Sequence, residues 1–73
     1  MPDLYHVFVN FDDGRGFNPE FSDEKRSVAV DEMNDIRRSS QLKVKNVKLV
    51  KLPENINAGQ LSRGQREQLG LHF

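Results

Sequence analysis

The sequence predicts a small α+β domain in which one amphipathic helix packs on a two- or three-stranded, antiparallel-type sheet. Three observations predict it: a β-branched and aromatic run over residues 4–11, a helical pattern over residues 22–38, and a second apolar alternation over residues 41–52. We therefore place a β/α core domain at residues 1–53 and a flexible, weakly ordered C-terminal tail at residues 54–73.

The first run is the most secure strand, because its residue types pack well on a pleated surface. One face of the strand is expected to lie against the core: Tyr5, Val7, Val9 and Phe11. The other face is expected to be half exposed: Leu4, His6, Phe8 and Asn10. Two aspartates and two glycines follow the strand, so we predict a loop that runs to about Ser22.

The helix is predicted from its ends and from its apolar arc. Ser22 is the expected N-cap, acidic residues occupy the first turn, and two arginines occupy the last turn, where the helix dipole favours them. The arc that should face the sheet consists of Ala29, Met33 and Ile36, flanked by Val28 and Val30.

Residues 41–52 predict a strand whose apolar phase changes near Asn46. Either a β-bulge at Lys45 and Asn46 or a tight two-residue turn there would restore one apolar face. We favour the bulge, because the two strands of a hairpin would be very short. Pro53 ends the strand, since it cannot donate to a ladder.

The segment after Pro53 carries scattered apolar residues and three glycines. Ser62 and Gln65 match a capping box, which predicts one short helix that ends near Leu69 and Gly70. We expect the rest of the tail to be mobile, to become ordered on binding, and to be dispensable for folding.

The net charge of zero conceals a strong separation of charge along the chain. Residues 1–35 hold nine acidic and three basic residues, a net −6, whereas residues 36–73 hold eight basic and two acidic residues, a net +6. We predict a bipolar surface that is recognised by a macromolecular partner with complementary charge. In the alternative, the two halves neutralise each other across the fold and leave no patch.

The candidate partner-binding residues lie in the loop after the first strand, at the helix end, in the lysine-rich strand and in the tail. They are Asp12, Asp13, Arg15, Arg37, Arg38, Lys43, Lys45, Lys48, Arg63 and Arg66. Direct nucleic-acid binding by Lys43, Lys45, Lys48 and Lys51, extended by Arg63 and Arg66, is a weaker alternative, because Phe73 is the only aromatic residue after Phe21. Lysines also protect an edge strand from unwanted pairing, which is a sufficient reason for their presence.

The sequence does not predict an enzyme. The acidic residues near Gly14 lack the spacing of a calcium loop, and His6 and His72 are far apart with no nucleophile arranged beside them. We expect no catalytic residue, no cofactor and no metal.

The whole chain, from its opening MPDLYHVFVNF (residues 1–11) to its closing QREQLGLHF (residues 65–73), resembles small phage-encoded transcription regulators that bind the host's RNA polymerase. The resemblance implies a protein without catalytic activity that engages the large β and β′ polymerase subunits, blocks promoter use by interfering with the σ factor, and promotes antitermination. It assigns no contact residues.

Our leading hypothesis is therefore a monomeric, protein-binding inhibitor of bacterial RNA polymerase that acts in the cytoplasm of the host cell. Two alternatives belong to other classes. One is a small nucleic-acid-binding module that uses the lysine-rich strand and the tail arginines. The other is an inhibitor of a different host factor, in which the acidic half imitates a phosphate backbone.

Overall fold

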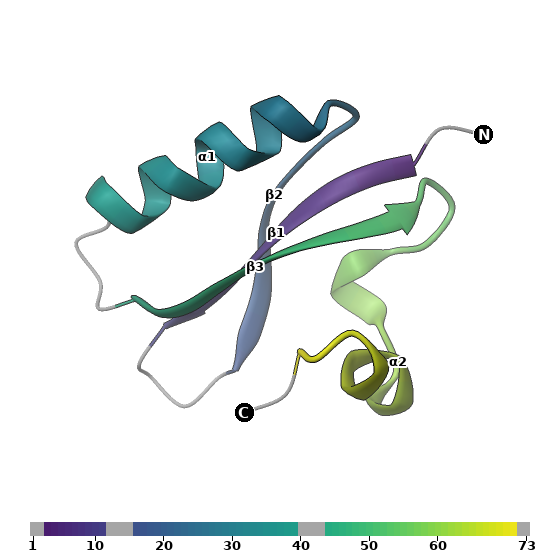
Figure 1. Cartoon of the computed structure of the whole chain (residues 1–73). Helices are drawn as coiled ribbons and strands as arrows, with labels where there is room; N and C mark the ends of the chain where they lie inside the picture. Colours follow the sequence, from purple (N-terminus) through teal and green to yellow (C-terminus); the bar gives the residue numbers. More distant parts are fainter. Residues whose placement is uncertain (1–2, 12–15, 40–43, 72–73) are drawn as a thin grey trace.

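A computed structural model describes residues 3–11, 16–39 and 44–71 of the chain (Figure 1). The elements in order are β1 (Asp3–Phe11), β2 (Phe17–Asp23), α1 (Arg26–Ser39), β3 (Val44–Pro53), the 3₁₀ turn η1 (Ala58–Gln60) and α2 (Arg63–Gln68). The strands form an antiparallel sheet in the order β2-β1-β3, so the first strand of the chain is central. This confirms the predicted α+β class, with three strands in the sheet.

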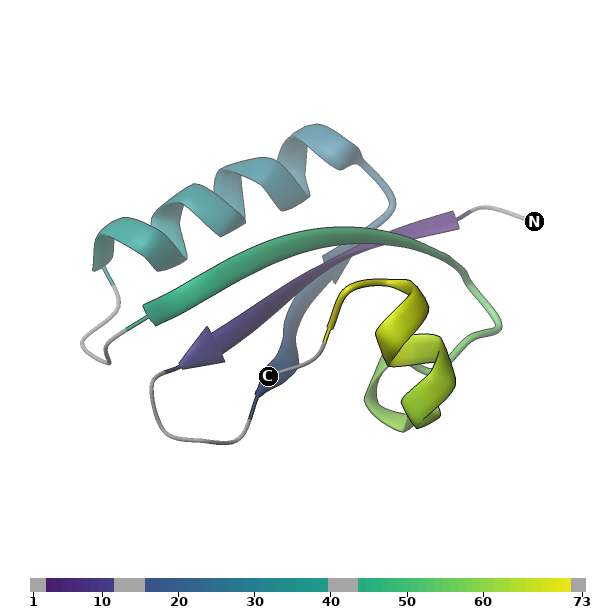
Figure 2. The same cartoon turned by 60° about the horizontal axis from the view of Figure 1, so that its bottom comes forward.

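The molecule has three layers (Figures 1 and 2). Helix α1 crosses one face of the sheet, and residues 54–71, which we call the C-terminal segment, lie against the other face. Each face has its own apolar cluster, and β1 contributes to both. None of the described helices is long and apolar enough to cross a membrane.

The cluster under α1 is the one that the sequence predicts. Val7, Val9 and Ala29 are completely buried, and Met33 and Ile36 pack against them. Three of the helix positions that define the predicted apolar arc therefore do face the sheet. Val28, which flanks the arc, remains exposed.

The opposite face of β1 is largely buried, so the prediction of a half-exposed face is wrong. Phe8 is completely buried, and the exposed fractions of His6 and Asn10 are only 7% and 4%. Ala58 and Leu71 of the C-terminal segment share the cluster that buries Phe8. The segment thus belongs to the core, in contrast to the weakly ordered tail expected from residue 54 onwards, because it supplies the apolar side chains that this face of the sheet needs.

The short helix α2 begins at the predicted capping box. The Ser62 hydroxyl accepts from the Gln65 amide (3.2 Å), and the Gln65 side chain accepts from the Ser62 amide (2.9 Å). These two hydrogen bonds satisfy donors that the first turn of a helix leaves free. A six-residue helix is too short to be stable alone, so the capping box helps to define where it starts.

The end of α2 directs Leu71 into the core. Gly70 adopts a φ of 75°, and its amide donates to the Glu67 carbonyl (3.1 Å), while the Leu71 amide donates to the Arg66 carbonyl (2.7 Å). This pair of hydrogen bonds is a Schellman motif, which favours glycine at the left-handed position. The reversal sends the chain back toward the sheet, and Leu71 becomes fully buried.

Both outer strands contain a bulge with a charged residue in it. On β3, Asn10 pairs with Asn46 and Phe11 with Val44, which leaves Lys45 without an opposite residue. This confirms the predicted bulge and rules out the hairpin alternative, because β3 is one continuous strand. On β2, the register likewise shifts so that Glu20 is skipped.

The predicted loop up to Ser22 is wrong for residues 17–23, which form β2. Ser22 pairs with His6 in the sheet, so it does not cap the helix, which begins at Arg26. The Asp23 carboxylate instead accepts from the Lys25 amide (2.8 Å) in the turn before α1. Pairing with β1 therefore overrides the local turn preference of this stretch.

Leu71→Ala should destabilise the protein by about 2 to 5 kcal/mol, because it leaves a cavity in the buried cluster that contains Phe8. Leu71→Met, which nearly conserves volume, should cost less than about 1.5 kcal/mol. Urea titration followed by circular dichroism measures both values. The exposed residue Gln60 provides a control, since Gln60→Ala should change the free energy of unfolding by less than about 0.5 kcal/mol. Equal effects of Leu71→Ala and Gln60→Ala would show that the C-terminal segment is not part of the core.

Acidification should destabilise the protein through His6. Its Nε2 is buried without a hydrogen-bond partner among the described residues, and burial lowers the pKa of its imidazole below the usual 6.5. The unfolded chain therefore takes up a proton more readily than the folded chain. The contribution of neutral His6 to the free energy of unfolding is fully present above pH 6.5 and is lost as the pH falls below that value toward the folded pKa.

Free energies of unfolding measured between about pH 7.5 and about pH 5 test this effect of His6. His6→Leu should flatten the dependence on pH, whereas His72→Gln, which keeps His6, should retain it. A slope that survives in His6→Leu would assign the effect to other groups.

Candidate partner-binding surface

The strand order places opposite charges on the two edges of the sheet. Strand β2 forms one edge and belongs to the acidic half of the chain, whereas β3 forms the other edge and belongs to the basic half. We call Glu20 and Asp23 the acidic edge, and Lys45, Lys48 and Lys51 the basic edge. The charge separation along the sequence thus becomes a separation across the sheet, with β1 between the two edges.

The lysines of the basic edge occupy both faces of the sheet. Lys48 is opposite Phe8, on the face that carries the C-terminal segment, and Lys51 is opposite Tyr5, on the α1 face. Lys45 lies in the bulge. All three residues are exposed, so a partner that approaches this edge meets positive charge above and below the strand.

Only one of these lysines has an ion pair within the described part of the chain. Lys51 Nζ lies 3.5 Å from an Asp3 carboxylate oxygen, and both side chains are about half exposed (58% and 41%). A pair of this kind contributes little, because water screens it and both side chains lose freedom. It does not prevent Lys51 from meeting a carboxylate of a partner.

The helix arginines lie at the end of α1 that leads toward the start of β3 (Figures 1 and 2). Arg37 and Arg38 are both exposed, and an Arg38 guanidinium nitrogen lies 2.9 Å from an Asp35 carboxylate oxygen. The negative end of the α1 dipole stabilises their positive charges at this position. The two arginines also add to the charge at the end of the molecule where β3 begins.

The two tail arginines have different environments. Arg63 is almost fully exposed and pairs weakly with Glu67 at 3.6 Å. Arg66 is half-buried, and its Nη2 donates to the Phe17 carbonyl (2.7 Å). This hydrogen bond joins α2 to the start of β2, so Arg66 holds the C-terminal segment against the sheet. Asp12, Asp13, Arg15 and Lys43 lie outside the described residues.

Charge neutralisation across the fold is partial. Ion pairs join the acidic half to the basic half at Asp3–Lys51 and Asp35–Arg38. The sheet edges nevertheless keep their signs, because β1 separates them and neither Lys45 nor Lys48 has a carboxylate partner among the residues that the structure describes. The bipolar surface is therefore clearest at the edges.

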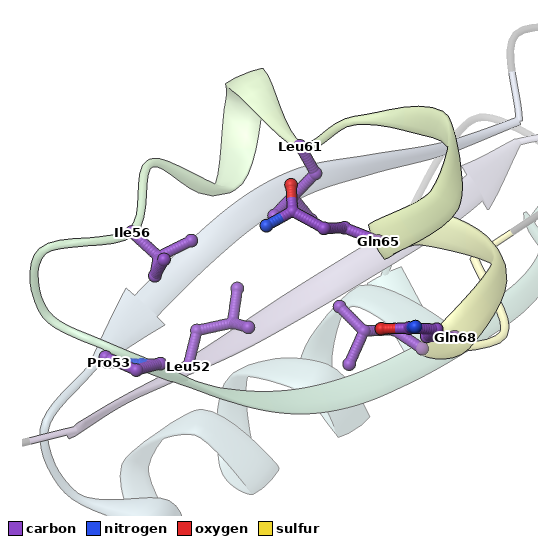
Figure 3. Close-up of a pocket in the computed structure, with 7 residues that line it drawn as sticks. Leu52, Pro53, Ile56, Leu61, Gln65 and Gln68 are labelled. Atoms are coloured by element: carbon purple, nitrogen blue, oxygen red, sulfur yellow. The ribbon is translucent and has the colours of Figure 1, made fainter.

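An apolar hollow of about 180 Å³ lies between the end of β3 and the C-terminal segment (Figure 3). Its lining consists of Leu52, Pro53, Ile56, Leu61, Gln65, Gln68 and Leu69. These residues offer apolar contact and two amides, but none of them is an acid, a base or a metal ligand. Within residues 3–11, 16–39 and 44–71, no cluster of three or more His, Asp or Glu side chains is placed to hold a metal ion.

Comparison with known proteins finds no matching family model, and neither the curated proteins nor the solved structures give a significant match. The site is thus defined by the geometry of this chain. The sequence predicted Lys45 and Lys48 as partner-binding residues and indicated Lys51 only for the nucleic-acid alternative, whereas it did not predict the acidic edge. The charges were visible in the sequence, but their place at an edge depends on β2, which reads locally as a loop.

Arg66→Ala should cost about 1 to 2 kcal/mol of folding free energy, because it removes a hydrogen bond to a buried strand end and leaves the Phe17 carbonyl without that donor. Arg63→Ala is the matched control in the same helix and should cost less than about 0.5 kcal/mol, since that side chain is exposed. Denaturant titration of the two variants measures the difference. Similar values for both would argue that Arg66 does not join α2 to the sheet.

Proposed function

We propose that this protein is a non-catalytic inhibitor of bacterial RNA polymerase that binds the large β and β′ subunits in the cytoplasm of the host cell. On this proposal it prevents σ-dependent promoter use and promotes antitermination. The resemblance of the whole chain to small phage-encoded transcription regulators supports the identity of the partner. The chemistry of the surface supports the mode of action, which is binding.

The observation that carries the proposal is the basic edge. Three exposed lysines occupy one outer strand, and the opposite strand of the sheet carries acidic residues. Complementary charges of this kind increase association rates and fix the orientation of a partner. A large multisubunit enzyme offers enough surface for both edges to be used, so that binding is specific although the net charge of the chain is zero.

The positions of the aromatic side chains favour protein over nucleic acid as the partner. Recognition of single strands combines positive charge with aromatic side chains on which bases stack. The aromatic residues that the structure describes are instead packed in the two clusters: Phe8 and Phe17 in one, and Tyr5, Phe11 and Phe21 in the other. Nucleic-acid binding therefore remains the alternative, with the lysines and Arg63 as its contacts.

The proposal predicts a stable complex with purified polymerase core enzyme. The chain should co-elute with the core enzyme on a sizing column, and polymerase subunits should be recovered from a bacterial lysate by the immobilised protein. Failure of both measurements would overturn the proposal. A shift by nucleic acid alone, weakening steeply with salt, would favour the nucleic-acid alternative.

The double variant Lys45→Glu/Lys48→Glu should weaken this complex by about ten-fold or more, which corresponds to about 1.4 kcal/mol. Its free energy of unfolding should stay within about 0.5 kcal/mol, because both side chains are exposed. Lys25→Glu/Arg26→Glu is the matched control, since it changes the net charge equally at the start of α1. Equal weakening by both double variants would attribute binding to net charge and not to the basic edge.

A further inference from the structure

We propose that the outer edge of β3 binds an extended acidic segment of the partner, which adds to the sheet as a fourth strand. The identity of the partner rests on the proposed function, but the mode of binding does not. Strand addition of this kind takes affinity from main-chain hydrogen bonds and specificity from alternate side chains.

The backbone of β3 is available for pairing with a further strand. Over the described residues, this ten-residue strand pairs with β1 alone. In an antiparallel ladder, alternate residues direct their N–H and C=O groups away from the neighbour, so half of these groups on an outer strand are open. The register is continuous from Asn46 to Pro53, which is long enough for a strand of ordinary length.

The other edge of the sheet is less suited to pairing with an added strand. Strand β2 contains Pro19, which has no N–H to donate, and Glu20, which is skipped by the ladder. The turn η1 also packs beside β2. The two edges are thus unequal, and β3 is the edge where a partner strand can pair.

The positions of the lysines on β3 favour an acidic strand. A strand beside β3 directs successive side chains to opposite faces, and each lies about 5 Å from its cross-strand neighbour. Residues opposite Lys48 and Lys51 are three apart in such a strand and point to opposite faces, as the two lysines do. The basic edge therefore fits an extended segment with two acidic residues three positions apart.

The same lysines exclude the most obvious competitor, which is a second copy of this chain. Two β3 edges that pair with each other would bring three lysines of each copy together. Like charges that face each other across strands are destabilising. The lysines thus reject self-pairing and favour an acidic strand, which is consistent with a monomer that binds a different protein.

Amide hydrogen exchange of the full chain, alone and with purified core enzyme, tests the proposal on the natural complex. Binding should slow exchange in residues 46–52 by a larger factor than in residues 17–23, because only β3 gains main-chain hydrogen bonds. If the core enzyme binds without protecting residues 46–52, strand addition is wrong and the proposed function stands. If the core enzyme does not bind at all, the proposed function fails, and a synthetic probe still tests the edge.

The probe is a capped peptide, Thr-Val-Glu-Val-Thr-Glu-Val-Thr, with its two glutamates three positions apart. Two control peptides carry N-methyl groups at the odd or at the even positions, so each keeps the charges but loses the hydrogen bonds of one edge. Strand addition uses one edge of the peptide, and hence only one of the two controls should bind about ten-fold more weakly or worse. Lys48→Glu should weaken all three peptides.

Three outcomes of the peptide titration would overturn the proposal. Equal binding by the parent peptide and both controls would mean that charge alone attracts the peptide. No binding by the parent peptide would mean that the edge does not accept a strand of this chemistry. Protection of residues 46–52 by a single-stranded oligouridylate of eight nucleotides, at lower concentration than by the peptide, would assign the edge to nucleic acid.

Discussion

The central strand β1 is buried on both faces, and this burial dictates how the other elements are arranged. A strand with Val7 and Val9 on one face and Phe8 on the other has no solvent-exposed side, so the sheet needs a cover on each. Helix α1 covers one face, and the C-terminal segment covers the other (Figures 1 and 2). The described residues after β3 are therefore needed for the core of this 73-residue chain. The short helix α2 returns Leu71 to that core.

The central position of β1 also determines where the charges lie. Its two partners become the edges of the sheet, and they come from halves of the chain with opposite charge. The core and the bipolar surface therefore both depend on the central position of β1, since this most apolar strand separates the more highly charged strands β2 and β3. Each outer strand also places a charged residue, Glu20 or Lys45, in a bulge, where regular pairing is interrupted.

Binding through such an edge suits a protein with a small core. An added strand uses hydrogen-bonding groups that the fold already exposes, so it requires no strained pocket and no buried polar group in the free protein. The basic edge supplies selectivity through charge, while α1 and the C-terminal segment hold the sheet from either side. The apolar hollow at the end of β3 (Figure 3) lies beside the same strand and is made by the segment that completes the core.

Local patterns in the sequence are sufficient to predict several elements of the fold. These are the apolar strand β1, the arc of α1 with Ala29 toward the sheet, the bulge at Lys45 and the capping box of α2, and each depends on residues close together in the chain. The folded chain was needed to show that residues 17–23 form a strand, that Phe8 is buried, and which lysines share an edge. These features depend on packing between segments far apart in sequence, such as those of Phe8 and Leu71, which share one buried cluster, and no local pattern records such packing.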